Sequence, residues 1–372
     1  MLSKKINLLM ISSSSALGGG TKHMFSLGDS LKKEFKVCYA LPLNNHFNKY
    51  LNAKNHIYIN ERKLDLRDII KLLIFVNSES IDIIHAHGKG AGVIGRFVSF
   101  FSKKPIIYTF HGIHLKCHSW YKRLIYIIYE FLLGWIDSKK VLVSKSEKFY
   151  ARKSKIFLGN KSIIINNGVS NMSLKKIDQI DKKQNLSRNE TKINVISVCR
   201  FVKQKNIKDI VLIAKELSHI QFSIIGDGPL WKEINLLIVE KKINNIMMLG
   251  KKNNIFKYLY SADIYLSTSL YEGLPISILE AMSIGLPIVA SNVIGNCDTI
   301  ENEKSGFLYD LSDINNAVDF LEKLSSCKSL RKKMGIQAFQ RQRKLFSKNI
   351  MLNSYKKLYK KEYLKHLENK NI

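Results

Sequence analysis

The stretch INLLMISSSSALGGGTKHMFSLGDSLKK (residues 6–33) joins an apolar run to an amphipathic one through a loop rich in serine and glycine. We predict a strand over Ile6–Ser12 and a helix over Thr21–Lys33, because short β-rich runs and longer amphipathic ones indicate these two elements. A secretory signal is the other interpretation of the basic start, but Ile6–Ile11 is short for its apolar core. The backbone of Gly18–Gly20 opens the helix and can meet a phosphate there.

The same alternation continues through the first half of the chain. Parallel strands joined by crossover helices give this pattern, so we predict a doubly wound α/β domain over residues 1–170, with ligands at the carboxyl ends of its strands. The further strands are Lys36–Leu41, Ile81–His87, Ile106–His111 and Val141–Ser144, and the further helices are Leu64–Asn77, Ala91–Phe101 and Trp120–Ile136.

A second β/α series follows a polar stretch. Residues 171–191 hold few apolar side chains and are interpreted as a linker, and residues 192–344 as a second Rossmann-like domain. From about Arg331 the chain is typical of a helix with a strongly basic face, and we expect residues 345–372 to pack back on the first domain. Two α/β halves of this kind predict a cleft between them. The strands of the second half are Ile193–Cys199, Phe222–Gly226, Met247–Gly250, Ile264–Ser269 and Pro287–Ser291.

The composition describes a basic globular chain. Its 372 residues suffice for two domains with separate cores, and a hydrophobic content of 45% excludes a disordered chain. The 60 Lys and Arg residues against 30 Asp and Glu favour nucleic acid, anionic lipid or phosphorylated ligands as partners. No apolar run reaches the roughly 18 residues that suggest a transmembrane helix. The cysteines are scattered singly, which indicates a reducing cytoplasm: Cys38, Cys117, Cys199, Cys297 and Cys327.

Two glutamates separated by seven residues mark a strand-to-helix junction in the second half, at Glu272 and Glu280. Pro275 suits the first turn of a helix, and Gly273 lets the backbone approach a ligand closely. The helix start would offer free N–H groups to an anion, with Glu272 at its mouth and Glu280 placed for a diol such as ribose. Alternatively, both glutamates lie on an ordinary solvated helix face.

The sequence around these glutamates resembles the signature of glycosyltransferase family 4. The resemblance rests on Ser267–Pro275, Leu279–Met282 and Gly285–Ala290, with support from Gly226–Leu230, Arg200-Phe201 with Lys205, and Asn167–Val169. It spans nearly the whole chain and implies a GT-B fold, in which two Rossmann-like, doubly wound domains face a central cleft. The first would bind the acceptor and the second the nucleotide sugar.

The resemblance also implies roles for particular residues. Arg200 and Lys205 would neutralise the donor diphosphate as it gains charge, Glu272 would position the donor sugar, and Glu280 would hold ribose. The donor-binding set further includes Gly18, Gly19, Gly273, Leu274 and Pro275.

His111 resembles the family's histidine near the transferred sugar, where it would contact a hydroxyl. Thr21 stands where the family commonly has Glu or Gln, which leaves that polar contact in doubt.

No metal or other cofactor is expected. An Asp-x-Asp motif, which holds a metal ion in single-domain glycosyltransferases, is absent from the sequence. His85 and His87 are spaced like a metal pair, but no third or fourth ligand is apparent, so structural or cleft-lining roles are favoured.

The segments Gly295–Asp298 and His111–His114 resemble the branch that builds bacterial surface polysaccharides and lipid-linked oligosaccharides. The expected reaction is retaining transfer of a hexose or N-acetylhexosamine from a UDP-sugar to a glycan acceptor, for which a glycan carried on polyprenyl diphosphate is the expected form. The leaving phosphate would take the acceptor proton. Two alternatives stay open at this point, a nucleotide-sugar epimerase of the same fold and a basic nucleic-acid-binding protein, although no nucleic-acid module is recognisable.

The predicted helix over residues 120–136 has aromatic ends, apolar residues between them and basic flanks that include Lys122, Arg123 and Lys139. Such a helix can lie in a lipid interface, or it can face the core of the first domain. The first interpretation would place the protein on the inner face of the cell membrane, beside a lipid-linked acceptor.

Overall fold

The computed structural model describes residues 5–15, 18–43, 55–61, 63–115, 119–172 and 192–370. It divides into two compact units, one formed by Met1–Asn166 with Met351–Ile372 and the other by Asn167–Ile350. Both units are parallel α/β structures, as predicted. Most of the predicted linker, residues 173–191, lies outside the described residues.

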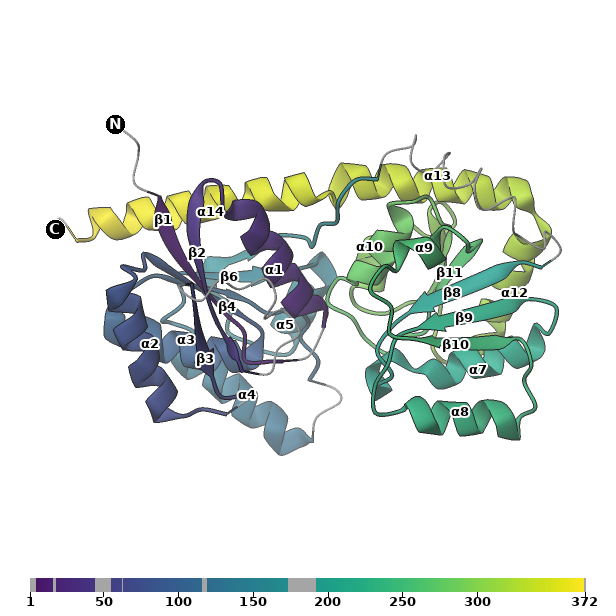
Figure 1. Ribbon diagram of the computed structural model, residues 1–372, viewed down its shortest axis with the longest axis horizontal. Coiled ribbons are helices and arrows are strands. Elements are labelled where there is room, and N and C mark those ends of the chain that lie inside the picture. The colour runs from purple at the N-terminus through teal and green to yellow at the C-terminus, as the bar shows by residue number, and fades with distance from the viewer. Residues whose placement is uncertain are drawn as a thin grey trace. The chain divides into compact units, whose positions relative to one another are not determined.

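The sheet of the first unit has the strand order β3-β2-β1-β4-β5-β6-β7, and its neighbouring strands pair in parallel (Figure 1). The order reverses between β1 and β4, so the carboxyl ends of these two strands form the switch point where doubly wound sheets bind ligands. The strands are β1 (Ile6–Ile11), β2 (Phe35–Pro42), β3 (His56–Ile59), β4 (Ile83–His87), β5 (Ile106–Thr109), β6 (Lys139–Leu142) and β7 (Ser162–Ile164).

Helices cover both faces of this sheet. On one face α2 and α3 contribute Leu72, Val76 and Val98 to the core, and on the other α1 packs with the final helix, α14, through Met24 and Tyr355 (Figure 1). The helices are α1 (Gly19–Leu31), α2 (Leu66–Ser78), α3 (Lys89–Ser102), α4 (Trp120–Leu133), α5 (Lys145–Lys153) and α14 (Lys348–Glu368), with a 3₁₀ turn η2 (Gly159–Lys161).

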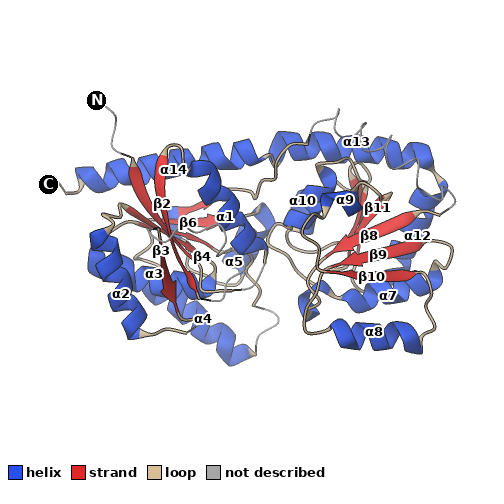
Figure 2. Cartoon of the chain, in the orientation of Figure 1, coloured by secondary structure: helices blue, strands red, loops and turns tan. Residues whose placement is uncertain are grey.

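The second unit has the strand order β10-β9-β8-β11-β12-β13, also parallel, with its switch point between β8 and β11. Figure 2 shows α7 and α8 on one side of this sheet and α9 and α10 on the other. The strands are β8 (Asn194–Val198), β9 (Gln221–Ile225), β10 (Ile246–Gly250), β11 (Ile264–Ser267), β12 (Ile288–Ser291) and β13 (Gly306–Tyr309). The helices are η3 (Lys203–Lys205), α7 (Ile207–Glu216), α8 (Trp231–Glu240), α9 (Phe256–Leu259), α10 (Ile276–Met282), α11 (Asn296–Thr299), α12 (Ile314–Ser326) and α13 (Lys328–Leu345).

The basic C-terminal region is two helices, α13 and α14, which separate at Phe346 and Ser347. Val169 pairs with this break, because its N–H donates to the carbonyl of Phe346 at 3.0 Å and its carbonyl accepts from the N–H of Lys348 at 2.8 Å. Backbone groups that a continuous helix would satisfy internally are therefore satisfied by another segment. Among the described residues, no helix combines the length and apolar character that crossing a membrane requires.

Candidate active site

Two loops of the second unit meet at its switch point. The first follows β8 and contains η3, and the second joins β11 to α10. They are tied together by the Leu270 N–H, which donates to the carbonyl of Gln204 at 2.8 Å, and by the Gln204 side chain, which donates to the carbonyl of Tyr271 at 2.9 Å. Thr268 adds a hydroxyl that donates to the carbonyl of Lys205 at 3.0 Å. The residues singled out in the two loops are thus held side by side.

Lys205 and Glu272 form an ion pair at this junction. The Lys205 ammonium donates to a carboxylate oxygen of Glu272, and the Ser269 hydroxyl donates to the same oxygen at 2.7 Å. Glu272 is only 6% exposed, so its charge is held largely out of water and depends on these partners. The sequence motif suggested both residues as donor-binding groups, and the structure brings them into contact.

Arg200 lies in the same loop as Lys205, shortly before it in the sequence, and is exposed. It makes no ion pair with any residue in the described part of the chain. A backbone hydrogen bond holds the turn that carries Arg200, because the Phe201 N–H donates to the carbonyl of Asp227 at 2.9 Å. Gly226 is required there, since its φ is +144° and a Cβ at this position would lie 1.7 Å from the carbonyl oxygen of Cys199. A rigid turn therefore presents a cation to solvent.

The structure corrects the expected place of Pro275. This residue is the N-cap of α10, with extended backbone angles (φ −72°, ψ 112°), and the helix begins at Ile276. The preceding Leu274 is buried, and its carbonyl accepts from the side chain of Asn167 at 2.8 Å. Gly295 packs against the same loop, where a Cβ would lie 2.6 Å from the carbonyl oxygen of Gly273. Glu280 lies on α10, in its second turn, and is partly exposed.

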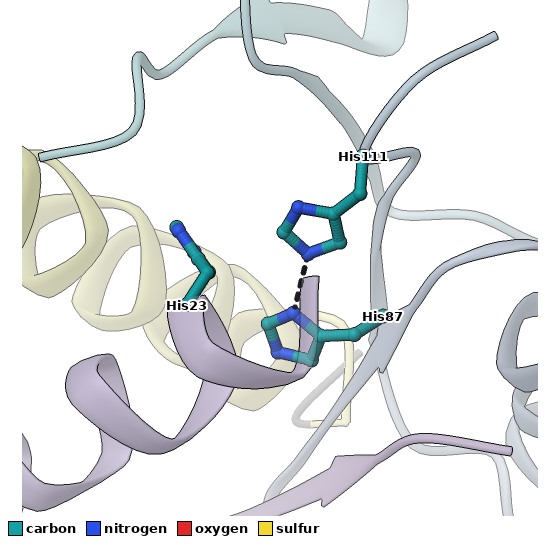
Figure 3. Close-up of side chains that lie close together, drawn as sticks. All are labelled: His23, His87 and His111. Carbon is teal, nitrogen blue, oxygen red and sulfur yellow. Dashed lines mark hydrogen bonds between the residues drawn. The ribbon is translucent and has the colours of Figure 1, made fainter. Parts of the chain in front are cut away.

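Three histidines of the first unit gather at the switch point of its sheet (Figure 3). His87 ends β4, His111 follows β5, and His23 comes from α1. The Nδ1 atom of His87 and the Nε2 atom of His111 are 2.9 Å apart and share a hydrogen bond. The ring of His23 stands edge-on to that of His111, with 4.8 Å between their centroids. Sequence reasoning found His87 and His111 and missed His23.

The backbone at His111 is held in an unusual conformation. Its φ is +58°, in the left-handed region that non-glycine residues rarely adopt. The buried carboxylate of Glu147 stabilises the segment by accepting from the N–H of Gly112 at 2.6 Å and from the N–H of Val143 at 2.7 Å. Glu147 was missed from the sequence, although Ser144-x-x-Glu147 is the spacing of a helix-capping box. Such local strain at the mouth of a sheet is typical of functional positions.

Burial keeps the histidines of this region neutral. Loss of hydration lowers the pKa of His85, His87 and His111 well below the usual 6.5, and the neighbouring histidines add to the effect. Each ring therefore carries one proton at neutral pH. Both ring nitrogens of His85 form hydrogen bonds, one with the Tyr359 hydroxyl at 2.6 Å and the other with the Thr109 hydroxyl at 2.8 Å.

These contacts revise the metal pair considered from the sequence. His85 has no nitrogen to spare, whereas His23, His87 and His111 place one ligand atom each within 4.8 Å of one another. A third candidate ligand therefore exists, contrary to the sequence interpretation. Three imidazoles so close together are a donor set that a zinc-like ion can use.

Comparisons with known proteins identify the family of the chain. The model of Glycosyltransferase Family 4 matches residues 17–171, and the model of glycosyl transferases group 1 matches residues 178–341. Together they cover most of the chain. The chain belongs to glycosyltransferase family 4.

This glycosyltransferase is 28% identical, over 72% of each chain, to the UDP-Gal:alpha-D-GlcNAc-diphosphoundecaprenol alpha-1,3-galactosyltransferase of Escherichia coli. It is 23% identical to the capsular polysaccharide biosynthesis glycosyltransferase CapM of Staphylococcus aureus, over 91% of this chain and 93% of that one.

Solved structures confirm the GT-B fold of this glycosyltransferase. HepE of Anabaena, in complex with UDP and glucose, superposes with a TM-score of 0.82 at 16% identity, covering 96% of this chain and all of that one. The sucrose-phosphate synthase of Thermosynechococcus elongatus gives a TM-score of 0.83 at 16% identity, over 97% of this chain and all of that one. The epimerase and nucleic-acid alternatives find no support in these comparisons.

Proposed function

We propose that this glycosyltransferase is a retaining, metal-independent enzyme that transfers a hexose or N-acetylhexosamine from a UDP-sugar to a lipid-linked glycan. The observation that carries the proposal is the cationic group at the switch point of the second unit, where Arg200 is exposed and Lys205 is paired with Glu272. Doubly wound sheets bind nucleotides at this place, and a diphosphate needs cations there.

The proposed reaction exchanges one bond at the anomeric carbon for another. The bond to the diphosphate oxygen breaks, the acceptor oxygen bonds to the same face, and the acceptor proton passes to the leaving diphosphate. Arg200 meets the growing negative charge directly. Lys205 meets it as its pairing with Glu272 loosens, which frees the Glu272 carboxylate to face the sugar and its developing positive charge.

The remaining site residues bind or orient the substrates in this proposal. Glu280 holds the ribose diol, and the backbone of Gly273, Leu274 and Pro275 lines the donor site. The backbone of Gly18 and Gly19, at the start of α1, offers N–H groups to a phosphate or to the acceptor. His111 contacts a hydroxyl of the transferred sugar. The choice of UDP follows the relatives, one named for UDP-Gal and one crystallised with UDP.

The acceptor proposal rests on helix α4. Among its residues only Glu130 is buried, whereas large apolar side chains face solvent. The exposed ones in and just after this helix are Trp120, Tyr121, Leu124, Ile125, Ile128, Phe131, Leu132 and Trp135. Tyr126 and Ile127 pack against the core of the first unit, so one face of the helix is core-facing and the wider apolar face is exposed. Such a face with basic residues beside it suits an anionic membrane surface, where a polyprenyl-diphosphate acceptor would reside on the cytoplasmic side.

Product analysis tests the proposal. The purified chain is incubated with UDP-, GDP- and ADP-sugars and with polyprenyl-diphosphate glycans, in buffer containing EDTA, and the products are identified by mass spectrometry. We expect transfer from a UDP-sugar only, undiminished by EDTA, with the anomeric configuration of the donor kept in the NMR spectrum. An inverted anomeric centre, or activity that EDTA abolishes, would overturn the corresponding part of the proposal.

A further inference from the structure

The His87–His111 hydrogen bond joins two neutral rings, so only one of them can donate its proton. Both rings carry a single proton at neutral pH, because burial lowers the pKa of each. Either His87 donates from Nδ1, or His111 donates from Nε2. Nδ1 of His111 lies on the side that points away from His87 (Figure 3). It carries a proton in the first arrangement and a lone pair in the second.

The surroundings of His87 decide between the two arrangements. Its other nitrogen, Nε2, is buried and has no hydrogen-bond partner, and the residue is 5% exposed. If His111 were the donor, His87 would carry its proton on Nε2, as a buried N–H without an acceptor. If His87 is the donor, Nε2 is only a lone pair without a partner. Buried N–H groups without acceptors are the rarer and more costly case.

We infer that His87 is a positioning residue that donates its Nδ1 proton to His111 and thereby fixes the proton of His111 on Nδ1. His111 then presents an N–H donor, not a lone pair, toward substrate. It recognises an oxygen that accepts a hydrogen bond, such as a sugar hydroxyl or phosphate oxygen. This inference rests on the proposed function for the identity of the substrate, but not for the location of the proton.

The framework around His87 holds it in place for this task. The ring of His85 lies against that of His87, with centroids 3.9 Å apart, and His85 is itself fixed by Tyr359 and Thr109. The His111 ring is flanked by the His23 ring, 4.8 Å away between centroids, and by Gly20, where an added Cβ would approach it to 3.3 Å. The packing around both rings limits their rotation, so the hydrogen bond determines the tautomer.

A metal ion at His23, His87 and His111 is the competing arrangement. If His87 bound it through Nδ1, the proton would again be forced onto the buried Nε2, which lacks the acceptor that metal-bound histidines ordinarily have. The tautomer arrangement satisfies more of the cluster and is the one we adopt.

The direct test is long-range ¹H–¹⁵N NMR of the full chain with ¹⁵N-labelled histidine, at neutral pH and after dialysis against EDTA. His111→Asn identifies the resonances of His111. We expect a neutral His111 protonated on Nδ1. Protonation on Nε2 would overturn the inference, as would a stoichiometric transition metal found in the protein before dialysis. Neither result depends on any activity, so failure of the proposed function remains a separate outcome.

Variants of His87 test the positioning role. Asn places an amide N–H close to where Nδ1 lies, whereas Leu fills the space without donating. We expect His87→Asn to keep kcat within about threefold, and His87→Leu to lower kcat roughly 5- to 20-fold, the equivalent of one hydrogen bond, with a smaller change in donor KM.

The control is Ser99→Ala, which removes a buried hydrogen bond of 2.6 Å to the carbonyl of Lys104 elsewhere in the same unit. It should change stability but neither kcat nor the His111 tautomer. Equal losses of kcat in the Asn and Leu variants, with the His111 tautomer unchanged, would refute the role of His87.

Discussion

At the scale of single residues, the pairing of Lys205 with Glu272 determines which charges a donor meets first. The carboxylate offsets much of the Lys205 charge. In the proposed reaction Arg200 therefore attracts the diphosphate first, and Lys205 acts at the later stage of bond breaking. We predict that Arg200→Ala raises the Kd for UDP and lowers kcat/KM about 10²- to 10³-fold, because it removes a donor to the developing oxyanion.

Lys205→Ala should lower kcat/KM to a similar extent, with a larger share of the loss in kcat. The control is Lys208→Ala, since Lys208 forms an exposed pair with Glu233 in the same unit and should not matter. Isothermal titration with UDP and initial rates separate the effects. Unchanged donor affinity and turnover in both Arg200→Ala and Lys205→Ala would exclude this diphosphate site.

The buried histidines give a prediction for stability against pH. Burial lowers the pKa of His85, His87 and His111 below 6.5, so below that pH the unfolded chain binds more protons than the folded one. The free energy of unfolding is therefore unaffected by these histidines above about pH 6.5. It decreases as the pH falls below that value, by up to ~1.4 kcal/mol per histidine and pH unit. The free energy of unfolding of the first unit, measured with urea, should therefore be lower at pH 5.5 than at pH 7.5. His85→Asn should reduce that loss by about a third, and a pH-independent midpoint would contradict the prediction.

The residues of the site differ in how far the sequence could predict them. Arg200, Lys205 and Glu272 lie in motifs, so their roles could be proposed from the residue pattern alone. His23 could not be found in this way, because it joins the cluster only after α1 packs across the ends of β4 and β5. Glu147 carried a local signal as a capping residue, but its bond to Gly112 depends on the strand order.

At the scale of elements, α4 turns its one acidic residue inward together with Tyr126 and Ile127, and turns most of its other apolar residues outward. Glu130 enters a fully buried network in which Arg96 of α3 donates to Glu130 at 2.8 Å and to both oxygens of Asp137 at 2.9 and 2.6 Å. Burial raises the pKa of Asp137, although Arg96 opposes the shift. It lowers the pKa of Lys140, which lies 3.8 Å from Asp137, to about 8. The network and the packing of Tyr126 and Ile127 together attach this helix to the first unit.

We predict that Arg96→Met destabilises the first unit by roughly 3–5 kcal/mol, since it leaves the buried Glu130 without its cation and Asp137 with only the more distant Lys140. The quadruple variant Arg96→Met, Glu130→Leu, Asp137→Leu, Lys140→Met should recover much of this loss, because no buried charge then lacks its partner. Lys36→Ala, which breaks a partly exposed pair with Glu79, serves as the control and should cost less than about 1 kcal/mol. Denaturant unfolding measures all three. A small effect of Arg96→Met would show that water reaches the network.

Most strands were predictable from the sequence, including four-residue ones such as β5 and β12, whereas β3, β7 and β13 were missed. The missed strands are short and lie at the edges of their sheets. Such segments gain strand geometry from their neighbour in the sheet rather than from their own pattern. The pairing of Val169 with the break between α13 and α14 could not be predicted, because Val169 lies far away in the sequence.

At the scale of the whole molecule, the chain crosses between the two units twice. Residues Met351–Ile372 return to the first unit, where Tyr355 and Tyr359 are fully buried and reach Thr109 and His85. The end of the chain therefore completes the core beneath the histidine cluster. Among the described residues of the first unit, α4 and not the basic C-terminal helix carries the largest group of exposed large apolar side chains.

We predict from this surface that the full chain binds vesicles containing phosphatidylglycerol, and binds phosphatidylcholine vesicles weakly. The side chains of Trp120, Ile125 and Leu132 are 75%, 63% and 63% exposed, and a lipid interface would remove them from water. Replacing all three with Ser should reduce vesicle flotation at least ~10-fold, since each apolar side chain contributes about 1.5 kcal/mol or more when buried.

The matched control for this surface is Leu236→Ser with Val239→Ser on α8, which removes two equally exposed apolar side chains from the second unit. It should bind vesicles like the unmodified chain. Salt should weaken binding only partly. It screens the charges of Lys122 and Arg123, but it does not weaken the contact of the apolar face with lipid. Flotation that survives the α4 substitutions but disappears in high salt would mean that the basic charge of the chain alone attracts it to lipid, and α4 would then need another partner.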